Sequence, residues 1–164
     1  MRSKVKKSDL DSFLQACNKD KFELSVDRYH FICILKCLSR KTNENARFDR
    51  YKVLEKESVG MYRIKVIQRS KKERKITSWN VWRRYNDFDE VHKILDDKEE
   101  FPSRSFLTSS TAKTLMEERR QKFKKWICIL PKIMESLRTI ASRKRRDKLV
   151  KVLCTFLWED RKDL

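Results

Sequence analysis

Two arginines and a tyrosine, Arg83-Arg84-Tyr85, stand at the end of a strand-like run and directly before a helix-like one. An arginine side chain binds phosphate oxygens in a fixed two-pronged geometry. A tyrosine ring can lie beneath a ligand ring while its hydroxyl stays in water. The triplet therefore suits a phosphorylated ring, although taken alone in so basic a chain it is more often solvated surface than a site.

Arg119 is a second candidate, because it lies on the apolar face of a predicted helix that runs from about residue 113 to 130, where Pro131 should end it. Phe123 and Trp126 share this face at helical spacing, so the Arg119 side chain faces inward. An inward guanidinium needs an anionic partner, which is either a ligand or a core carboxylate. The neighbouring cations lie off this face and are expected to be solvated: Arg120, Lys122, Lys124 and Lys125.

The charge balance points to a polyanionic partner. The chain of 164 residues carries 42 Lys and Arg against 24 Asp and Glu, a net charge of +18. Residues 113–151 hold 14 of these cations and only 4 acidic residues. Such a surplus fits a phosphoinositide membrane, a nucleic acid or an acidic protein, and charge alone does not choose among them.

Composition excludes several enzyme classes. A P-loop, a dinucleotide fingerprint, a kinase glycine-rich loop and a nucleophile elbow each need several glycines, and this chain has only Gly60. Its two histidines, His30 and His92, lie in different segments and offer little for a Ser-His-Asp or Cys-His arrangement. We interpret His92 as a partly buried helix residue and predict a protein that is not an enzyme and has no cofactor.

The five cysteines are odd in number and have no framework spacing, which indicates reduced thiols in an intracellular protein. His30, Cys33 and Cys37 could be drawn as metal ligands, but the segment is mostly apolar and lacks an obvious fourth ligand, so core cysteines are favoured over a metal site. No signal peptide and no transmembrane segment are visible. Any membrane contact should be peripheral.

Three strands are predicted before the Arg-Arg-Tyr triplet ends. Residues 51–54 read as a short strand, Gly60 opens a second that runs to about residue 68, and residues 76–85 form a third with alternating side chains. Short loops, including a basic turn over residues 70–75, join them. The pattern indicates an antiparallel meander.

The remaining segments read as an N-terminal extension and a helical half. Residues 1–47 are predicted as a basic, partly helical extension of unknown role, in which residues 22–38 fit either a strand or a helix. After the meander, a helix over residues 88–95 should be capped by Asn86 or Asp87, and a last helix carries an apolar stripe ending near Leu157. The expected fold class is α+β, a three-stranded antiparallel β-meander packed against a helical subdomain.

From about residue 48 to 160 the chain resembles a PX (phox homology) domain, and we assign residues 48–160 to it. The resemblance rests on the meander, on the R-R-Y-x-D-F signature at residues 83–88 and on the helix behind it. The later pieces follow in the family's order: Phe101-Pro102, E-E-R-R at residues 117–120, Trp126-Ile127 and Phe156-Leu157. Within the family, WNVWRRYNDF and the basic stretch before the last helix look most like sorting nexins that pair a PX domain with a RUN domain.

The resemblance implies a phosphoinositide site, usually for phosphatidylinositol 3-phosphate. Arg84 matches the arginine that holds the 3-phosphate, and Tyr85 matches the aromatic floor under the inositol ring. Arg119 matches the inward arginine that bonds the 4- and 5-hydroxyls. Arg104 stands where the family has a lysine that holds the 1-phosphate, in a loop that reads Phe-Pro-Ser-Arg instead of Phe-Pro-Pro-Lys.

Phe106 and Leu107 lie where PX domains often dip apolar side chains into the bilayer, and they fit a cover for the core equally well. The implied function is a non-catalytic module that works in membrane trafficking and binds endosomal membranes peripherally from the cytoplasm. Two alternatives stay open. One is a basic nucleic-acid-binding protein, and the other is a PX-fold protein-interaction domain without lipid specificity, for which the altered loop is the hint.

Overall fold

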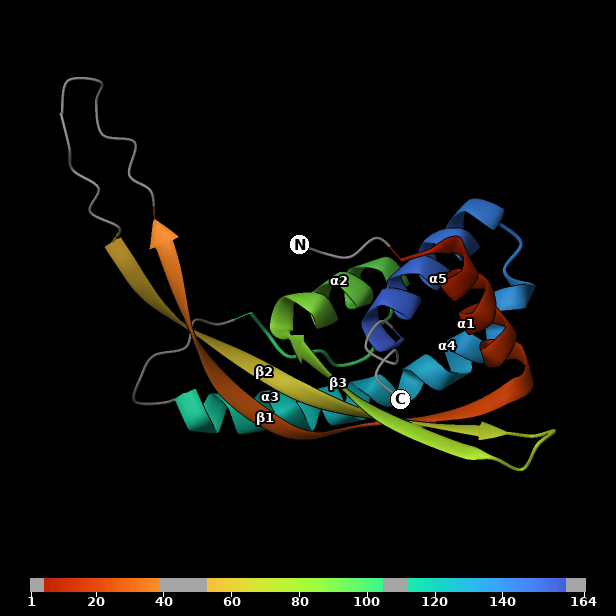
Figure 1. Cartoon of the computed structure of the whole chain (residues 1–164), viewed down its shortest axis with the longest axis horizontal. Helices are drawn as coiled ribbons and strands as arrows, with labels where there is room; N and C mark the ends of the chain where they lie inside the picture. The colour runs from red at the N-terminus through yellow and green to blue at the C-terminus, as the bar shows by residue number, and fades with distance from the viewer. Residues whose placement is uncertain (1–4, 39–52, 105–111, 159–164) are drawn as a thin grey trace, which may run out of the picture.

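The computed structural model describes residues 5–38, 53–104 and 112–158. They form two layers, a curved three-stranded sheet and a group of helices packed against it (Figure 1). This is the α+β arrangement predicted from the sequence, a β-meander packed against a helical subdomain.

The sheet consists of β1 (Asp20–Leu38), β2 (Val53–Ser70) and β3 (Ile76–Arg84), which are antiparallel and stand in chain order. β1 and β2 pair along their whole length, whereas β3 pairs with β2 only from Ile76 to Arg84, which lies opposite Met61. β1 and β2 therefore continue as a two-stranded ribbon beyond the end of β3 (Figure 1). The chain leaves β3 beside the middle of β2, and there the candidate triplet is found.

The strand assignment needs two corrections. The segment over residues 22–38, left open between strand and helix, lies in β1 and provides the first strand of the meander. The strands predicted at residues 51–54 and 60–68 are not separate, because β2 runs without interruption from Val53 and contains Gly60. The predicted boundary between residues 47 and 48 lies outside the described residues, while β1, on its N-terminal side, is a full member of the sheet.

A β-bulge explains why β1 lacked a clear strand pattern. Val26 pairs with Ile64, but Arg28 pairs with Arg63, so Asp27 is one extra residue in β1. The alternation of buried and exposed side chains shifts by one position at this point, and the inward Val26 is followed by an inward Tyr29. A bulge also bends its strand, in agreement with the curvature of the sheet (Figure 1).

Five α-helices occur in the described residues. Three of them match helices expected from apolar spacing, namely α1 (Lys7–Lys19), α2 (Tyr85–Leu95) and α5 (Arg143–Leu157). The predicted helix over 113–130 is α3 (Ala112–Trp126), followed by the 3-10 turn η1 (Ile127–Ile129), the short helix α4 (Leu130–Ser136) and a second 3-10 turn, η2 (Leu137–Thr139).

Pro131 was expected to end a helix, and the structure places it in the first turn of α4 instead. The first four N–H groups of a helix have no partner within it, so a proline there removes no helical hydrogen bond. The sequence alone could not separate these two positions, because both put the proline beside a helix end.

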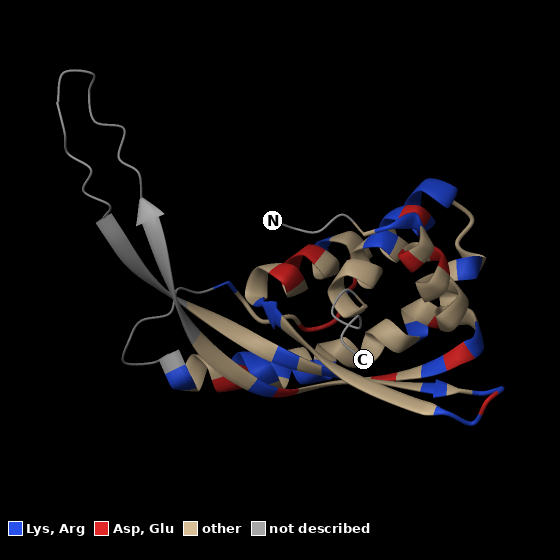
Figure 2. Cartoon of the chain, in the orientation of Figure 1, with Lys and Arg blue, Asp and Glu red and all other residues tan. Residues whose placement is uncertain are grey.

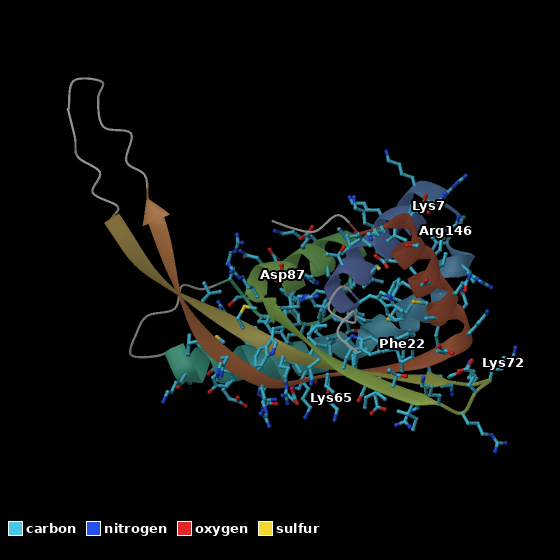
Figure 3. The ribbon with its side chains drawn as sticks, in the orientation of Figure 1. Lys7, Phe22, Lys65, Lys72, Asp87 and Arg146 are labelled. Carbon is cyan, nitrogen blue, oxygen red and sulfur yellow. The ribbon has the colours of Figure 1, made fainter. Side chains whose placement is uncertain are left out.

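The core lies between the inner face of the sheet and the helices. The fully buried strand residues Tyr62, Ile64 and Val66 face fully buried helix residues such as Phe88 and Phe123. The alternate residues point away, as Figure 3 shows for Lys65 on the outer face of β2. Among the described residues, no helix is long and apolar enough to cross a membrane.

Candidate functional site

The two arginines of the triplet lie on opposite sides of β3. Arg83 faces the helices, where its Nε donates to the carbonyl of Phe156 at 2.8 Å and its Nη2 to that of Thr155 at 3.0 Å. Trp79, on the same side of β3, donates from Nε1 to the carbonyl of Leu157 at 2.8 Å. β3 therefore satisfies the last carbonyl groups of α5, which have no partner within the helix.

Arg84 has an exposed side chain, and its backbone takes part in the cap of α2. Its N–H donates to Oδ2 of Asp87 at 2.9 Å, which makes Arg84 the residue that precedes α2 and Asp87 its capping partner. The cap was expected at Asn86 or Asp87, before a helix over residues 88–95, and the helix in fact begins three residues earlier, at Tyr85, with Arg84 as its cap. Of the two arginines, Arg84 has the exposed side chain and Arg83 is bonded to α5.

Tyr85 joins the start of α2 to the segment that follows α2. Its hydroxyl donates to the carbonyl of Pro102 at 2.6 Å. Its half-buried ring lies 5.9 Å from the ring of Phe101 and 5.9 Å from that of Phe123, measured between centroids. The ring is therefore held at its edge and at its hydroxyl, and it keeps a partly exposed position.

Arg119 is buried, as its place on the apolar face of the helix predicted, with 6% of its surface exposed. Its guanidinium carbon lies 4.7 Å from the centroid of the Tyr85 ring, within the range of a cation–π contact. Its Nη2 donates to the carbonyl of Ser103 at 3.5 Å. These contacts place an arginine from α3 directly against the tyrosine of the triplet.

Tyr62, on the inner face of β2, also lies near this arginine. Burial raises the pKa of Tyr62 to about 12, although the nearby Arg119 guanidinium acts in the opposite direction on that pKa. The Tyr62 hydroxyl also contacts the sulfur of Met116 at 3.0 Å. Arg119 is thus positioned by two tyrosines, one from the sheet and one from α2.

Arg104 is exposed and lies in the same loop as Pro102 and Ser103, where it contacts α2. Its Nη2 donates to Oδ1 of Asn86 at 2.8 Å. Burial and then Asp89 raise the pKa of Tyr85, while Arg119 and Arg104 lower it, so both cations act electrostatically on the Tyr85 hydroxyl. The structure therefore gathers Tyr85, Arg104 and Arg119, with Arg84 adjacent to Tyr85 in the chain. Phe106 and Leu107 lie outside the described residues.

Arg120 was expected to be solvated, and this expectation is wrong. Its side chain is only 15% exposed, and its Nη1 donates to the carbonyl of Val26 at 3.1 Å. The Arg120 guanidinium also pairs with Glu117 at 2.6 Å and lowers the pKa of that carboxyl to about 2. The long side chain reaches β1 next to the bulge, which the helical spacing of α3 could not reveal. The other three cations of this set are exposed: Lys122, Lys124 and Lys125.

The described Lys and Arg residues lie on both the helices and the sheet. Figure 2 shows Lys and Arg on α3, in the first turn of α5 and in the turn between β2 and β3, and acidic residues on α2. Lys7 and Arg146 lie at one end of the helical layer (Figure 3). No group of three His, Cys, Asp or Glu side chains in the described part of the chain could hold a metal ion. The side chains of Cys33 and Cys37 are outside that part.

Residues 71–149 match the PX domain family. The matched stretch contains Arg84, Tyr85, Arg104 and Arg119. PX domains are typically non-catalytic lipid-binding modules. A search of curated proteins finds no match to this chain.

Proposed function

We propose that this chain is a membrane-targeting module that binds phosphatidylinositol 3-phosphate on endosomes and acts in membrane trafficking, as in the sorting nexins. The PX match supports phosphoinositide binding in general. The choice of the 3-phosphate lipid follows from the family resemblance of the triplet and of Arg119. The module would be cytoplasmic and bound to the membrane only peripherally.

One observation carries the proposal: the buried Arg119 lies 4.7 Å from the Tyr85 ring, beside a loop that is bonded to both residues. A buried arginine that contacts an aromatic ring and a carbonyl is suited to hydroxyl groups of a bound sugar-like ring. An arginine that binds anions only through surface charge needs neither burial nor an aromatic contact. The arrangement therefore favours a stereospecific pocket over a diffuse basic surface.

The remaining roles follow from position. Arg84 would hold the 3-phosphate, because it is exposed and directly precedes Tyr85. Tyr85 would support the inositol ring, and Arg104 would exchange its bond to Asn86 for one to the 1-phosphate. Phe106 and Leu107 would enter the bilayer. We include α1 and β1 in the module, because β1 forms one edge of its sheet.

The test is a panel of liposomes, each containing one phosphoinositide, with phosphatidylserine liposomes and duplex and single-stranded nucleic acid as controls. We expect the strongest binding to phosphatidylinositol 3-phosphate. Equal binding to every phosphoinositide and to phosphatidylserine would show that the protein binds through a basic surface and has no specific pocket. Selective binding to another phosphoinositide isomer would support a membrane-targeting module and show that its ligand is that isomer.

A further inference from the structure

A polar network links α2, α3 and the segment between α2 and the loop over residues 101–104. None of its side chains is among the proposed ligand contacts. Asp97 lies in this segment, and its side chain is 12% exposed. Its Oδ2 accepts a hydrogen bond from Nε1 of Trp126 at 3.2 Å and lies 3.1 Å from Nδ1 of His92. Its Oδ1 accepts from the N–H of Glu99 at 3.1 Å. One carboxylate therefore ties together α2, α3 and the connecting segment.

The histidine of this network holds an aromatic ring in place. A carboxylate can only accept, so Nδ1 of His92 carries the proton in its contact with Asp97. With this bond made, the His92 ring lies parallel to the ring of Phe101, at 4.1 Å between centroids and 1° between planes. Phe101 also meets Trp126 edge to face at 5.2 Å and 80°. Phe101 is therefore fixed between α2 and α3.

Phe101 begins the loop that completes the candidate site. Pro102 follows it, and its carbonyl accepts the hydroxyl of Tyr85 at 2.6 Å. Ser103 then accepts from Arg119, and Arg104 donates to Asn86. A shift of Phe101 would move all three of these contacts, because they belong to the next three residues of the chain.

The loop needs this external support, because its own sequence supplies little stiffness. Proline restricts the backbone by fixing one dihedral angle, and only Pro102 does so here. Ser103 and Arg104 have ordinary backbone freedom, and each fixed residue costs conformational entropy on binding. A loop that is already held in the free protein avoids part of that cost.

We propose that His92 and Asp97 are positioning residues, which hold the loop over residues 101–104 in its binding geometry and thereby set the affinity for the headgroup. This inference rests on the proposed function of the site. Neither side chain would touch the ligand. They act through Phe101, which they hold beside Tyr85.

The experiment compares His92→Ala and Asp97→Asn with His30→Ala in the full chain. His30 is the only other histidine, and it lies on the outer face of β1, 5.9 Å from Trp82, so it is a matched control. Two readouts are needed: backbone amide hydrogen exchange across residues 98–104 in the ligand-free protein, and titration with the soluble headgroup of phosphatidylinositol 3-phosphate. Urea unfolding of each variant separates a loss of position from a loss of fold.

We expect faster exchange in the loop and about fivefold to tenfold weaker headgroup binding in both variants, the effect of one lost hydrogen bond on an equilibrium. His30→Ala should change neither readout. His92→Asn should restore part of the affinity, because its side-chain amide can still donate to Asp97, and it also serves if His92→Ala fails to fold. Unchanged exchange, or faster exchange with unchanged affinity, overturns the proposal. If the unaltered protein binds no headgroup, the proposed function fails, and exchange alone decides whether the network holds the loop.

Discussion

At the scale of single residues, two adjacent arginines have different tasks. Arg83 donates to carbonyls of Thr155 and Phe156 and so belongs to the packing of β3 against α5. Arg84 has an exposed side chain, and its N–H donates to Asp87 in the cap of α2. Since side chains alternate along a strand, neighbouring residues of the same type are placed in different environments.

We predict opposite effects for Arg84→Ala and Arg83→Ala. Arg84→Ala should abolish specific headgroup binding with little change in the free energy of unfolding, because its side chain is exposed. Arg83→Ala should lower the free energy of unfolding by about 2 kcal/mol, because charged hydrogen bonds to the end of α5 are lost. Headgroup titration and urea unfolding of both variants measure this. A folded Arg84→Ala protein that binds the headgroup normally would remove Arg84 from the site.

At the scale of elements, α3 presents two arginines in different directions. Successive residues on a helix are rotated by about 100°. Arg119 therefore points to Tyr85 and the loop, whereas Arg120 reaches the carbonyl of Val26 beside the bulge of β1. Thus α3 contributes Arg119 to the candidate site and Arg120 to the contact with the bulged strand β1.

Arg119→Ala should weaken headgroup binding by about tenfold or more, as expected for the loss of charged hydrogen bonds. Arg120→Ala should leave headgroup affinity nearly unchanged and lower the free energy of unfolding by about 1–2 kcal/mol, because the Val26 carbonyl loses its donor. The two variants remove the same charge from adjacent positions, so each is the control for the other. Equal losses of affinity would indicate a general effect of charge and no pocket on this face.

The elements differ in how far the sequence alone predicted them. The apolar spacing of α1, α2 and α5 was sufficient, because their buried faces keep the helical period. The sequence left the segment of β1 open between strand and helix, because the extra residue Asp27 interrupts the alternation that identifies a strand. Arg119 was expected to face inward from its neighbours on α3, and it does. The contacts of Arg120 and Asp97 were not foreseen, because they join segments that are distant in the chain.

At the scale of the whole molecule, two buried groups link the stability of the fold to alkaline pH. Burial raises the pKa of Tyr62 from 10.0 to about 12 and that of the Cys17 thiol from 9.0 to about 12. Folding therefore favours their neutral forms. The stability they contribute is fully present below their unfolded values and is lost as pH rises towards and through 12.

We predict that the free energy of unfolding falls between about pH 9 and pH 12, and that Tyr62→Phe makes this fall shallower by on the order of 2 kcal/mol. Phenylalanine keeps the buried ring and removes the group that ionises. Urea unfolding, followed by tryptophan fluorescence at a series of pH values, gives both curves. Curves that stay parallel up to pH 12 would contradict the role assigned to Tyr62.

The central question is whether the protein binds one phosphoinositide in a pocket or any polyanion through its charge, because a net charge of +18 attracts any polyanion. Attraction between exposed charges is screened by salt, whereas contacts of a partly desolvated pocket are screened much less. A basic surface near an anionic membrane contributes roughly 1 kcal/mol per Lys or Arg and is weakened in the same way. Salt therefore separates a pocket from a charged surface.

The most direct test is the salt dependence of liposome binding for the unaltered protein and for Arg84→Ala. We predict that at raised salt the unaltered protein still binds phosphatidylinositol 3-phosphate liposomes well above phosphatidylserine liposomes. At the same salt, binding of the Arg84→Ala protein to phosphatidylinositol 3-phosphate liposomes should be no stronger than its binding to phosphatidylserine liposomes. Binding of the unaltered protein to nucleic acid should be lost at raised salt and should show no sequence preference. Salt-resistant binding to nucleic acid, with no distinction between the two kinds of liposome, would contradict a phosphoinositide pocket even on a PX fold.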